Sequence, residues 1–296
     1  MAEAPKVPVR ECVGEALRFT ADNIRSIVMA SAAAAGAIML LTGVTLFAAP
    51  LGLFASLAST FVRAAVYAAF IGAVLFGAGA VRARLMRDAW RVWAAMAIVG
   101  FFMFIVMFVA SIPGMIVLLA GPLGSYVGDL TSAGQNQEQI VAVLARFAQE
   151  EPVAVLLFAL FYTAIWLLLT SRLYLAAPAS VDAGRVLTFE TWRWTRGAVA
   201  PIMWARIMLL APAYVFVSAL DALIASLFGI SAFDPAAVAS MAQGNPLAFL
   251  AYVFATSFIT IALYAALEAG LSTALYRVLN QAPTAGVRLD QIMKSD

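Results

Sequence analysis

The chain has 296 residues, of which 64% are apolar and 11% charged, and its mean hydropathy is +0.96. These values lie far outside the range of soluble proteins and predict an integral membrane protein. The net charge of +2 is small and the arginines are spread along the chain, so nucleic acid is not expected as a partner. Histidine is absent and Cys12 is the only cysteine, which excludes histidine-based catalysis, a disulfide within the chain and a multi-cysteine metal site. The sequence therefore predicts no cofactor and no bound metal.

The first predicted element is an amphipathic helix over residues 9–25. Its charged residues fill the side opposite the apolar ones, a pattern that is typical of a helix lying at a membrane surface. A secretory signal peptide is the alternative, but this stretch is too long and too rich in acids for the charged start of one. The apolar side consists of Val9, Val13, Ala16, Leu17, Thr20 and Ile24.

Six apolar stretches are each long enough to cross a hydrocarbon core of roughly 30 Å. Pro50 and Gly52 predict a tight turn between the first two, whereas the loop after the third is much longer. In that loop, residues 121–136 are expected to be flexible and residues 137–149 to form a short surface helix. Residues 234–243 are expected to form a second such helix. The expected spans are 27–49, 56–80, 93–119, 152–177, 199–228 and 246–279.

A five-residue motif occurs three times, each time shortly before an apolar stretch. It reads acid, small residue, large apolar residue, arginine, large apolar residue. The acid and the arginine lie three positions apart, so they can pair on one turn of a helix. The three copies occupy residues 15–19, 88–92 and 190–194.

Tyrosines provide a second landmark at matched spacing. Tyr162 lies 74 residues after Asp88, and Tyr264 lies 74 residues after Glu190. This agreement predicts that the second and third helical hairpins are copies of one unit. Whether the first hairpin, which contains Tyr67, is a further copy is left open. Chance matching between alanine-rich helices is the alternative to a repeat.

The predicted fold is an all-α polytopic membrane protein with six transmembrane helices. They are arranged as three repeated hairpins, each preceded by a cytoplasmic amphipathic elbow helix, within a single transmembrane domain over residues 1–296. The parts of this domain are an elbow at 9–25, a first hairpin at 27–80, an elbow and second hairpin at 82–177, an elbow and third hairpin at 185–279, and a polar tail at 280–296.

Basic residues indicate the orientation of the chain. They gather at the termini and in the loops after the second and fourth spans, whereas the outer loops carry only Arg146. The positive-inside rule therefore places both termini in the cytoplasm, and we expect the protein in a bacterial inner membrane.

Arg206 and Glu268 are the ionisable residues expected deepest within the spans. Each should lie about 14 to 15 Å from the cytoplasmic face, in antiparallel helices five and six. A structural ion pair that fixes how these helices dock is the favoured interpretation. The alternative is a transport site for a solute or a proton, because charge within the hydrocarbon is costly and often functional.

Other charged residues are expected near the ends of the spans. Arg63 and Asp221 should lie near the outer ends of spans two and five, where a salt bridge or simple snorkelling to the interface would accommodate them. Contacts with the headgroups of anionic phospholipids are expected for Arg18, Arg91, Arg172, Arg193 and Arg277.

The stretch 172–178, followed by 190–197 and by the closing Leu275, Tyr276 and Arg277, resembles a group of uncharacterised bacterial six-helix integral membrane proteins. That group includes the membrane domain attached to some glycerophosphoryl diester phosphodiesterases. The resemblance implies the six-helix fold and supplies no catalytic residues. No phosphodiesterase domain is recognised in these 296 residues, so that activity is not expected.

The sequence thus favours a non-enzymatic inner-membrane scaffold or accessory protein that associates with lipids or envelope proteins. Its expected partners are the lipid bilayer, anionic phospholipids, and either a membrane protein or further copies of the same chain. The alternative function is a transporter or channel for a small solute or a lipid, with its site at Arg206 and Glu268.

Overall fold

The computed structural model describes residues 7–134, 136–231 and 234–281. The regular structure in these ranges is entirely helical, with no strand. Six helical segments in the described part of the chain are long and apolar enough to cross a membrane, judged by length and composition. They are Ile24–Leu46, Gly52–Phe76, Ala78–Ala120, Pro152–Asp182, Val199–Leu227 and Pro246–Asn280. The prediction of an all-α protein with six membrane-spanning helices is confirmed at this level.

The chain divides into two compact units. The main unit comprises Met1–Ile98 and Ser171–Asp296, and the smaller unit comprises Val99–Thr170. The division falls inside two long helices, α4 (Ala78–Ala120) and α7 (Pro152–Arg172).

The main unit begins with three helices that correspond to the first elbow and hairpin. α1 (Val9–Asp22) and α2 (Ile24–Phe47) are separated only by Asn23, whose Nδ2 donates a hydrogen bond of 2.9 Å to the Phe19 carbonyl. A 3₁₀ turn, η1 (Ala49–Leu51), then leads into α3 (Gly52–Phe76). This turn contains Pro50 and forms where the sequence predicts a tight turn.

The helix α4 differs from the prediction, which placed an elbow and a span in succession. The break comes earlier than expected, at Gly77, whose φ of 83° suits a glycine. From Ala78 to Ala120 the helix is then continuous, so residues 82–91 are not a separate helix. No proline or glycine occurs between Ala80 and Val99 to interrupt it.

Charge pairing helps to explain why the polar part of α4 stays helical. Asp88 accepts a hydrogen bond of 2.8 Å from Arg91 and lies 3.4 Å from Arg84 Nε. These i,i+3 and i,i+4 contacts each stabilise a helix by about 0.2–0.5 kcal/mol. The pairing expected within the motif therefore forms in its second copy.

Shorter helices follow in the second half of the main unit. α8 (Ala176–Asp182) and α9 (Glu190–Trp194) precede the long α10 (Val199–Leu227), which passes through Pro212 without ending. α11 (Pro235–Gly244) confirms the small helix expected there. Asp234 caps it by accepting bonds of 3.0 and 3.2 Å from two backbone N–H groups.

The sixth expected span, 246–279, forms one helical segment, and it contains an irregular turn that the sequence did not predict. It consists of α12 (Pro246–Ile259), a π-helix η3 (Thr260–Ala265) and α13 (Ala266–Gln281). A π-turn changes which side chains share a helix face, and such turns are frequently found at functional sites.

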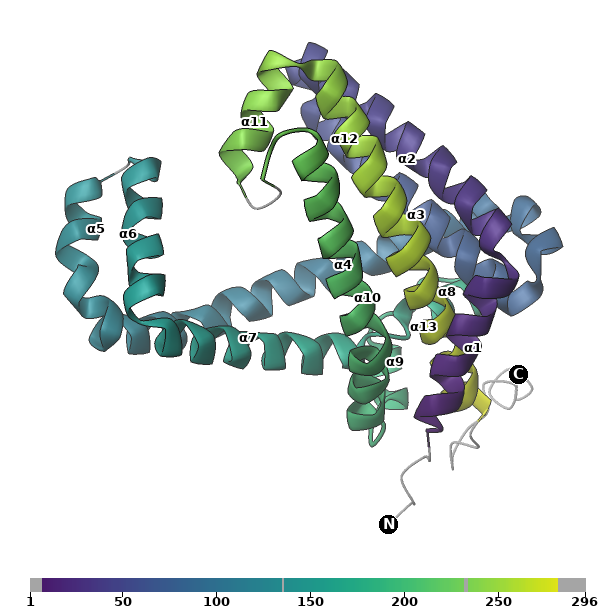
Figure 1. The fold of residues 1–296 in the computed structure, drawn as a ribbon. Coiled ribbons are helices and arrows are strands. Elements are labelled where there is room, and N and C mark those ends of the chain that lie inside the picture. The colour runs from purple at the N-terminus through teal and green to yellow at the C-terminus, as the bar shows by residue number, and fades with distance from the viewer. Residues whose placement is uncertain (1–6, 135, 232–233, 282–296) are drawn as a thin grey trace. The chain divides into compact units, whose positions relative to one another are not determined.

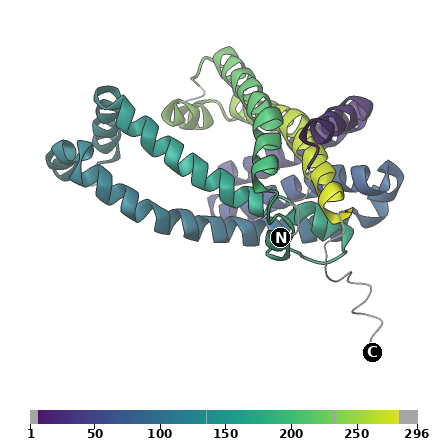
Figure 2. The same ribbon diagram turned by 90° about the horizontal axis from the view of Figure 1, so that it is seen from below.

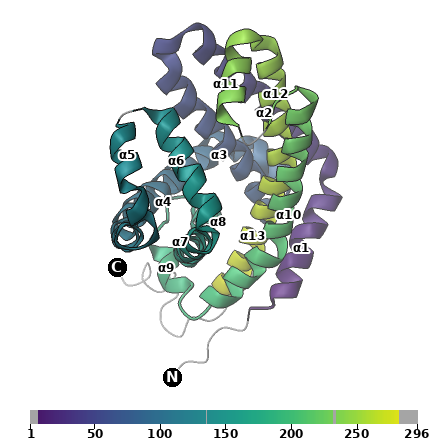
Figure 3. The same ribbon diagram turned by 60° about the vertical axis from the view of Figure 1, so that its left-hand side comes forward.

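The helices of the main unit are held together by small side chains and by two apolar clusters. α12 runs along α2, and α1 lies beside α13 and α10 (Figures 1 and 3). Cys12 and Ala16 are the buried residues of α1, whereas Leu17 and Ile24 are about half exposed at 49% and 50%. Fewer residues of α1 are therefore buried against the other helices than the predicted apolar side contains. The largest fully buried side chains of the two clusters are Leu175, Ile202, Leu271 and Leu275 in one, and Ile27, Ile71, Val92 and Val181 in the other.

The smaller unit contains the part of α4 from Val99 onwards and the part of α7 up to Thr170, with three shorter helices between them in the chain (Figure 2). A 3₁₀ helix η2 (Pro122–Tyr126) leads into α5 (Val127–Ala133), and α6 (Gln137–Glu150) confirms the helix expected in this loop. The prediction that residues 121–136 would be flexible was wrong for the described residues, because most of them are helical. An apolar cluster explains the order, and its buried members are Leu123, Tyr126 and Phe147.

Candidate functional site

Arg206 is a buried charged residue of the main unit and has 6% of its surface exposed. It projects from α10, and its Nη1 donates a hydrogen bond of 2.9 Å to the Oγ of the fully buried Ser171. Its Cζ also lies 4.7 Å from the centre of the Tyr174 ring. A hydroxyl and an aromatic face are thus arranged to stabilise a charge that would otherwise be costly inside a membrane.

Glu268 lies in the first turn of α13, directly after the π-helix, and is partly buried. Its carboxylate is near enough to Arg206 for an electrostatic attraction. The ion pairs within 4.0 Å that the structure records among the described residues do not include one between these two side chains. The structure therefore brings Arg206 and Glu268 into one neighbourhood, and one hydrogen bond of Arg206 goes to the Ser171 hydroxyl.

Three tyrosines complete this neighbourhood. Tyr67 of α3 shares a hydrogen bond of 3.1 Å with Ser272 of α13, and Tyr174, between α7 and α8, donates a long one of 3.5 Å to the Glu268 carbonyl oxygen. Tyr264 belongs to the π-helix. All three interact electrostatically with Glu268. We call this set the polar cluster: Arg206, Glu268, Tyr67, Tyr174, Tyr264, Ser171 and Ser272.

The local fold explains how the polar cluster assembles. The widened turn of η3 precedes α13 and carries Tyr264, whose ring centre lies 6.4 Å from that of Tyr214 on α10. Tyr174 lies in the turn between the end of α7 and the start of α8. The hydrogen bonds between members of the cluster join segments far apart in the sequence, so the cluster connects different helices.

The sequence pointed to Arg206 and Glu268, but it missed the tyrosines and serines as members of a site. Tyr67 and Tyr264 drew attention as landmarks of the repeat, and Ser171 drew none. A usable signal was available, because hydroxyl groups within apolar spans require hydrogen-bond partners. No pattern in the sequence shows which helices would supply those partners.

Arg63 and Asp221, expected as a pair near the outer ends of two spans, lie in α3 and α10. Arg63 is exposed, and no ion pair between the two is recorded among the described residues. Asp221 Oδ1 is buried and has no hydrogen-bond partner in the described part of the chain. The structure does not join these two residues.

The five arginines expected at lipid headgroups fall into three groups. Arg91 pairs with Asp88, and Arg277 donates to the Val74 carbonyl on α3, so both have partners within the protein. Arg172 is partly buried, with its Cζ 5.5 Å from the centre of the Trp192 ring. The side chains of Arg18 and Arg193 are exposed.

Cys12 does not offer a reactive nucleophile. Burial, together with the nearby carboxylates of Glu15 and Glu11, raises the pKa of its thiol to about 11. Since the thiolate is the reactive form of cysteine, almost none is present at neutral pH. Among the described residues no group of three or more potential metal ligands comes together.

Two pockets of the main unit can be compared with the polar cluster. One of about 420 Å³ lies between the start of α1 and α10, and one of about 370 Å³ lies beside residues 86–91 of α4. Neither is lined by Arg206 or Glu268. The polar cluster is therefore not part of either pocket.

The described part of the chain is thus helical, with six helices long and apolar enough to cross a membrane and with linked polar groups inside its main unit. Comparisons with protein-family models, with curated proteins and with solved structures find no match for this chain. The function has to be argued from the chain's own residues.

Proposed function

We propose that the protein is a non-enzymatic integral protein of a bacterial inner membrane, acting as a scaffold or accessory protein for lipids or envelope proteins. The observation that carries this proposal is that polar groups within the spans bind one another across helices. Arg206 binds Ser171, and Tyr67 binds Ser272. Linked polar groups of this kind hold helices in one arrangement, which is what a scaffold requires.

The proposed architecture is three hairpins, each led by an elbow at the cytoplasmic side. The docking of α1 supports the first elbow, because Cys12 and Ala16 are buried against the rest of the main unit. The inclusion of the first hairpin in the repeat is supported by Tyr67 and Tyr264, because both belong to the polar cluster. In the proposed second copy the elbow is continuous with the span, as α4 is.

The proposed orientation places both termini in the cytoplasm, where exposed arginines would meet anionic phospholipids. Arg18 and Arg193 support this part of the proposal because both are exposed and near the expected cytoplasmic ends of spans. The resemblance to the membrane domain of some glycerophosphoryl diester phosphodiesterases remains a prediction made from the sequence, and it implies the same six-helix fold.

A specific observation favours a second candidate function, transport. Glu268 follows directly on a π-helix, and its carboxylate has no hydrogen bond recorded among the described residues. An ionisable group next to an irregular turn within a span is a common arrangement in transport proteins. In this case Glu268 would exchange a proton or bind a cationic solute.

Flux through proteoliposomes separates the two candidates. Protons are followed with an entrapped pH dye, and labelled small solutes are followed by filtration, for the wild-type chain, Glu268→Gln and the exposed control Glu151→Gln. The scaffold proposal predicts equal background flux for all three proteins. A flux above that of empty vesicles that Glu268→Gln abolishes, while Glu151→Gln keeps it at normal expression, would contradict the scaffold and establish transport.

A further inference from the structure

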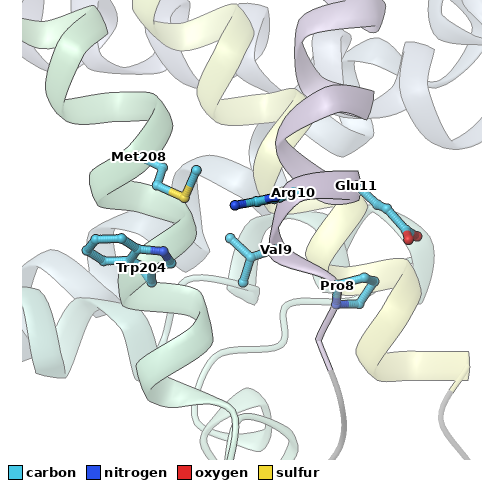
Figure 4. A pocket seen from close by; sticks show the side chains of 6 residues that line it. All are labelled: Pro8, Val9, Arg10, Glu11, Trp204 and Met208. Atoms are coloured by element: carbon cyan, nitrogen blue, oxygen red, sulfur yellow. The ribbon is translucent and has the colours of Figure 1, made fainter.

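A groove of about 420 Å³ separates the start of α1 from the first turns of α10. Trp204 and Met208 of α10 form one wall, and Pro8, Val9, Arg10 and Glu11 form the other (Figure 4). Both wall residues of α10 are exposed, at 57% for Trp204 and 39% for Met208. The groove lies entirely within the main unit, yet it is separate from the polar cluster.

The two charged residues of the groove point in different directions. Figure 4 shows the Arg10 side chain reaching across towards Trp204 and Met208, whereas the carboxylate of Glu11 points away from them. The space between the walls therefore has a guanidinium on one side and an indole with a thioether on the other. Its chemistry favours an occupant that has an anionic end and an apolar end.

The spacing along α10 supports an occupant that runs along the helix. Trp204 lies five residues after Val199, where α10 begins, which is about 7.5 Å along its axis. Met208 lies one turn deeper, about 6 Å further on. An indole near a helix end followed by an apolar side chain one turn deeper matches the passage from headgroups to acyl chains in a bilayer.

We propose that this groove binds one phospholipid with an anionic headgroup, a site that rests on the proposed association with lipids. The phosphodiester lies against Arg10, whose planar guanidinium can donate two parallel hydrogen bonds to it. The indole N–H of Trp204 offers a further donor to the headgroup region. The first part of an acyl chain lies over the Trp204 ring and Met208.

Two arguments favour a phospholipid over other occupants. The wall formed by Trp204 and Met208 belongs to a helix that is long and apolar enough to span a membrane, so lipid is the solvent that meets it. The charged side chain that faces Trp204 and Met208 is Arg10, whose positive charge complements a phosphate and would repel a cation. A free inorganic phosphate would satisfy Arg10 but would leave the apolar wall uncovered.

Native mass spectrometry of the full chain in mild detergent tests the site. The chain is stripped of lipid and then titrated with phosphatidylglycerol, with phosphatidylcholine of the same acyl chains, and with inorganic phosphate. The proteins compared are the wild type, Arg10→Gln, Arg10→Lys and Arg82→Gln, the last of which removes an exposed arginine of α4 outside the groove. Since Arg10 is also exposed, all four chains should fold alike, and gel filtration checks that they do.

The proposal predicts that Arg10→Gln weakens the tightest phosphatidylglycerol site about fivefold, the factor expected for one arginine near an anionic surface. Arg10→Lys should keep most of the affinity, Arg82→Gln should bind like the wild type, and phosphatidylcholine should bind more weakly. Equal binding by the wild type and Arg10→Gln would overturn the site. Displacement of the lipid by millimolar inorganic phosphate would also overturn the lipid as its occupant.

A second measurement follows the acyl chain. Phosphatidylglycerol brominated on its acyl chains quenches nearby indoles, so Trp204→Phe should lose part of the quenching at low lipid ratios. Unchanged quenching would overturn the position of the acyl chain. If the wild type and Arg10→Gln bind lipid equally, the proposed lipid site in the groove is wrong, whereas the proposed association with lipids stands. If the wild type binds no lipid, both proposals are wrong, so the two results can be told apart.

Discussion

Gly270 of α13 lies directly against Ala16 of α1. A Cβ placed on Gly270 would stand 3.0 Å from the Ala16 Cα and 3.2 Å from its Cβ, which is closer than a Cβ atom normally lies to its neighbours. The neighbours are backbone and a methyl group, so neither can swing away. This contact makes α1 an integral part of the main unit instead of a helix loosely attached to it.

Gly270→Ala should therefore loosen the docking of α1. Overpacking of this kind destabilises by about 1–3 kcal/mol, and a thermal unfolding scan in detergent should record a lower midpoint. Gly36→Ala in α2 is the matched control, because nothing lies within 4 Å of the added Cβ and alanine favours a helix. A midpoint for Gly270→Ala at or above that of Gly36→Ala would contradict the close contact.

The thiol of Cys12 should respond to pH as a buried group. Burial favours the neutral thiol, so in the folded chain half of it ionises only at about pH 11, against 9.0 for an ordinary cysteine. The rate of alkylation by iodoacetamide should therefore rise with pH through this higher value in the folded chain. Denaturation by dodecyl sulfate should move the rise to near pH 9.

The same shift links pH to stability. The raised pKa means that the stabilising contribution of the protonated thiol is fully present below about pH 9 and is lost as pH rises towards about 11. Cys12→Ala should remove that part of the pH dependence. Fast alkylation of the folded chain at pH 8 would show that the thiol is not buried against α13 and α10.

Ser171 should matter for stability because it accepts a hydrogen bond from a buried cation. Ser171→Ala removes this acceptor, and bonds to charged groups contribute about 1.5–3 kcal/mol. Ser59→Ala removes a hydroxyl that bonds only to the Ala55 carbonyl one turn earlier, and it serves as the control with a smaller effect. Unfolding curves of the two variants should differ in midpoint by several degrees.

The double variant Ser171→Ala, Arg206→Leu tests the same bond in another way. Replacing both partners by apolar groups can be nearly neutral, whereas replacing one leaves the other without its partner. We expect the double variant to be more stable than Ser171→Ala alone. Strictly additive destabilisation would mean that the two side chains do not interact.

In the smaller unit, Gly114 should tolerate no side chain while Tyr162 is present. A Cβ on Gly114 would lie 2.0 Å from the Tyr162 hydroxyl oxygen, which itself donates a 2.8 Å bond to the Ala110 carbonyl. Gly114→Ala should lower yield and thermal stability. Tyr162→Ala in the same chain should restore part of the loss, because it removes the clashing group. Equal stability of Gly114→Ala and the wild type would contradict this packing.

Much of the fold was predictable because membrane spans leave a strong signal. Length and hydropathy identified six spans, and turn residues such as Pro50 marked a short connection. Interruptions within spans were not predictable in the same way. The π-helix before Glu268 and the continuity of α4 through Asp88 depend on side-chain packing and charge pairing, which hydropathy does not record.

The candidate site was predicted in part for a related reason. Arg206 and Glu268 stand out because charge is rare within spans, so their depth could be counted along the helices. Tyr174 and Ser171 are ordinary residues for such a helix, and only the fold brings them to the guanidinium. The expected salt bridge of Arg63 with Asp221 rested on depth alone, and depth does not specify which helices lie side by side.

The measurement that tests the central claim most directly is affinity purification of the full chain in mild detergent, with mass spectrometry of the proteins and lipids that remain bound. The scaffold proposal predicts that anionic phospholipids, envelope proteins or both are retained reproducibly and above the level in a mock purification. Arg193→Gln with Arg18→Gln should reduce the retained anionic lipid, because both arginines are exposed. Reproducible absence of both lipids and proteins from the wild-type chain would contradict the proposed function.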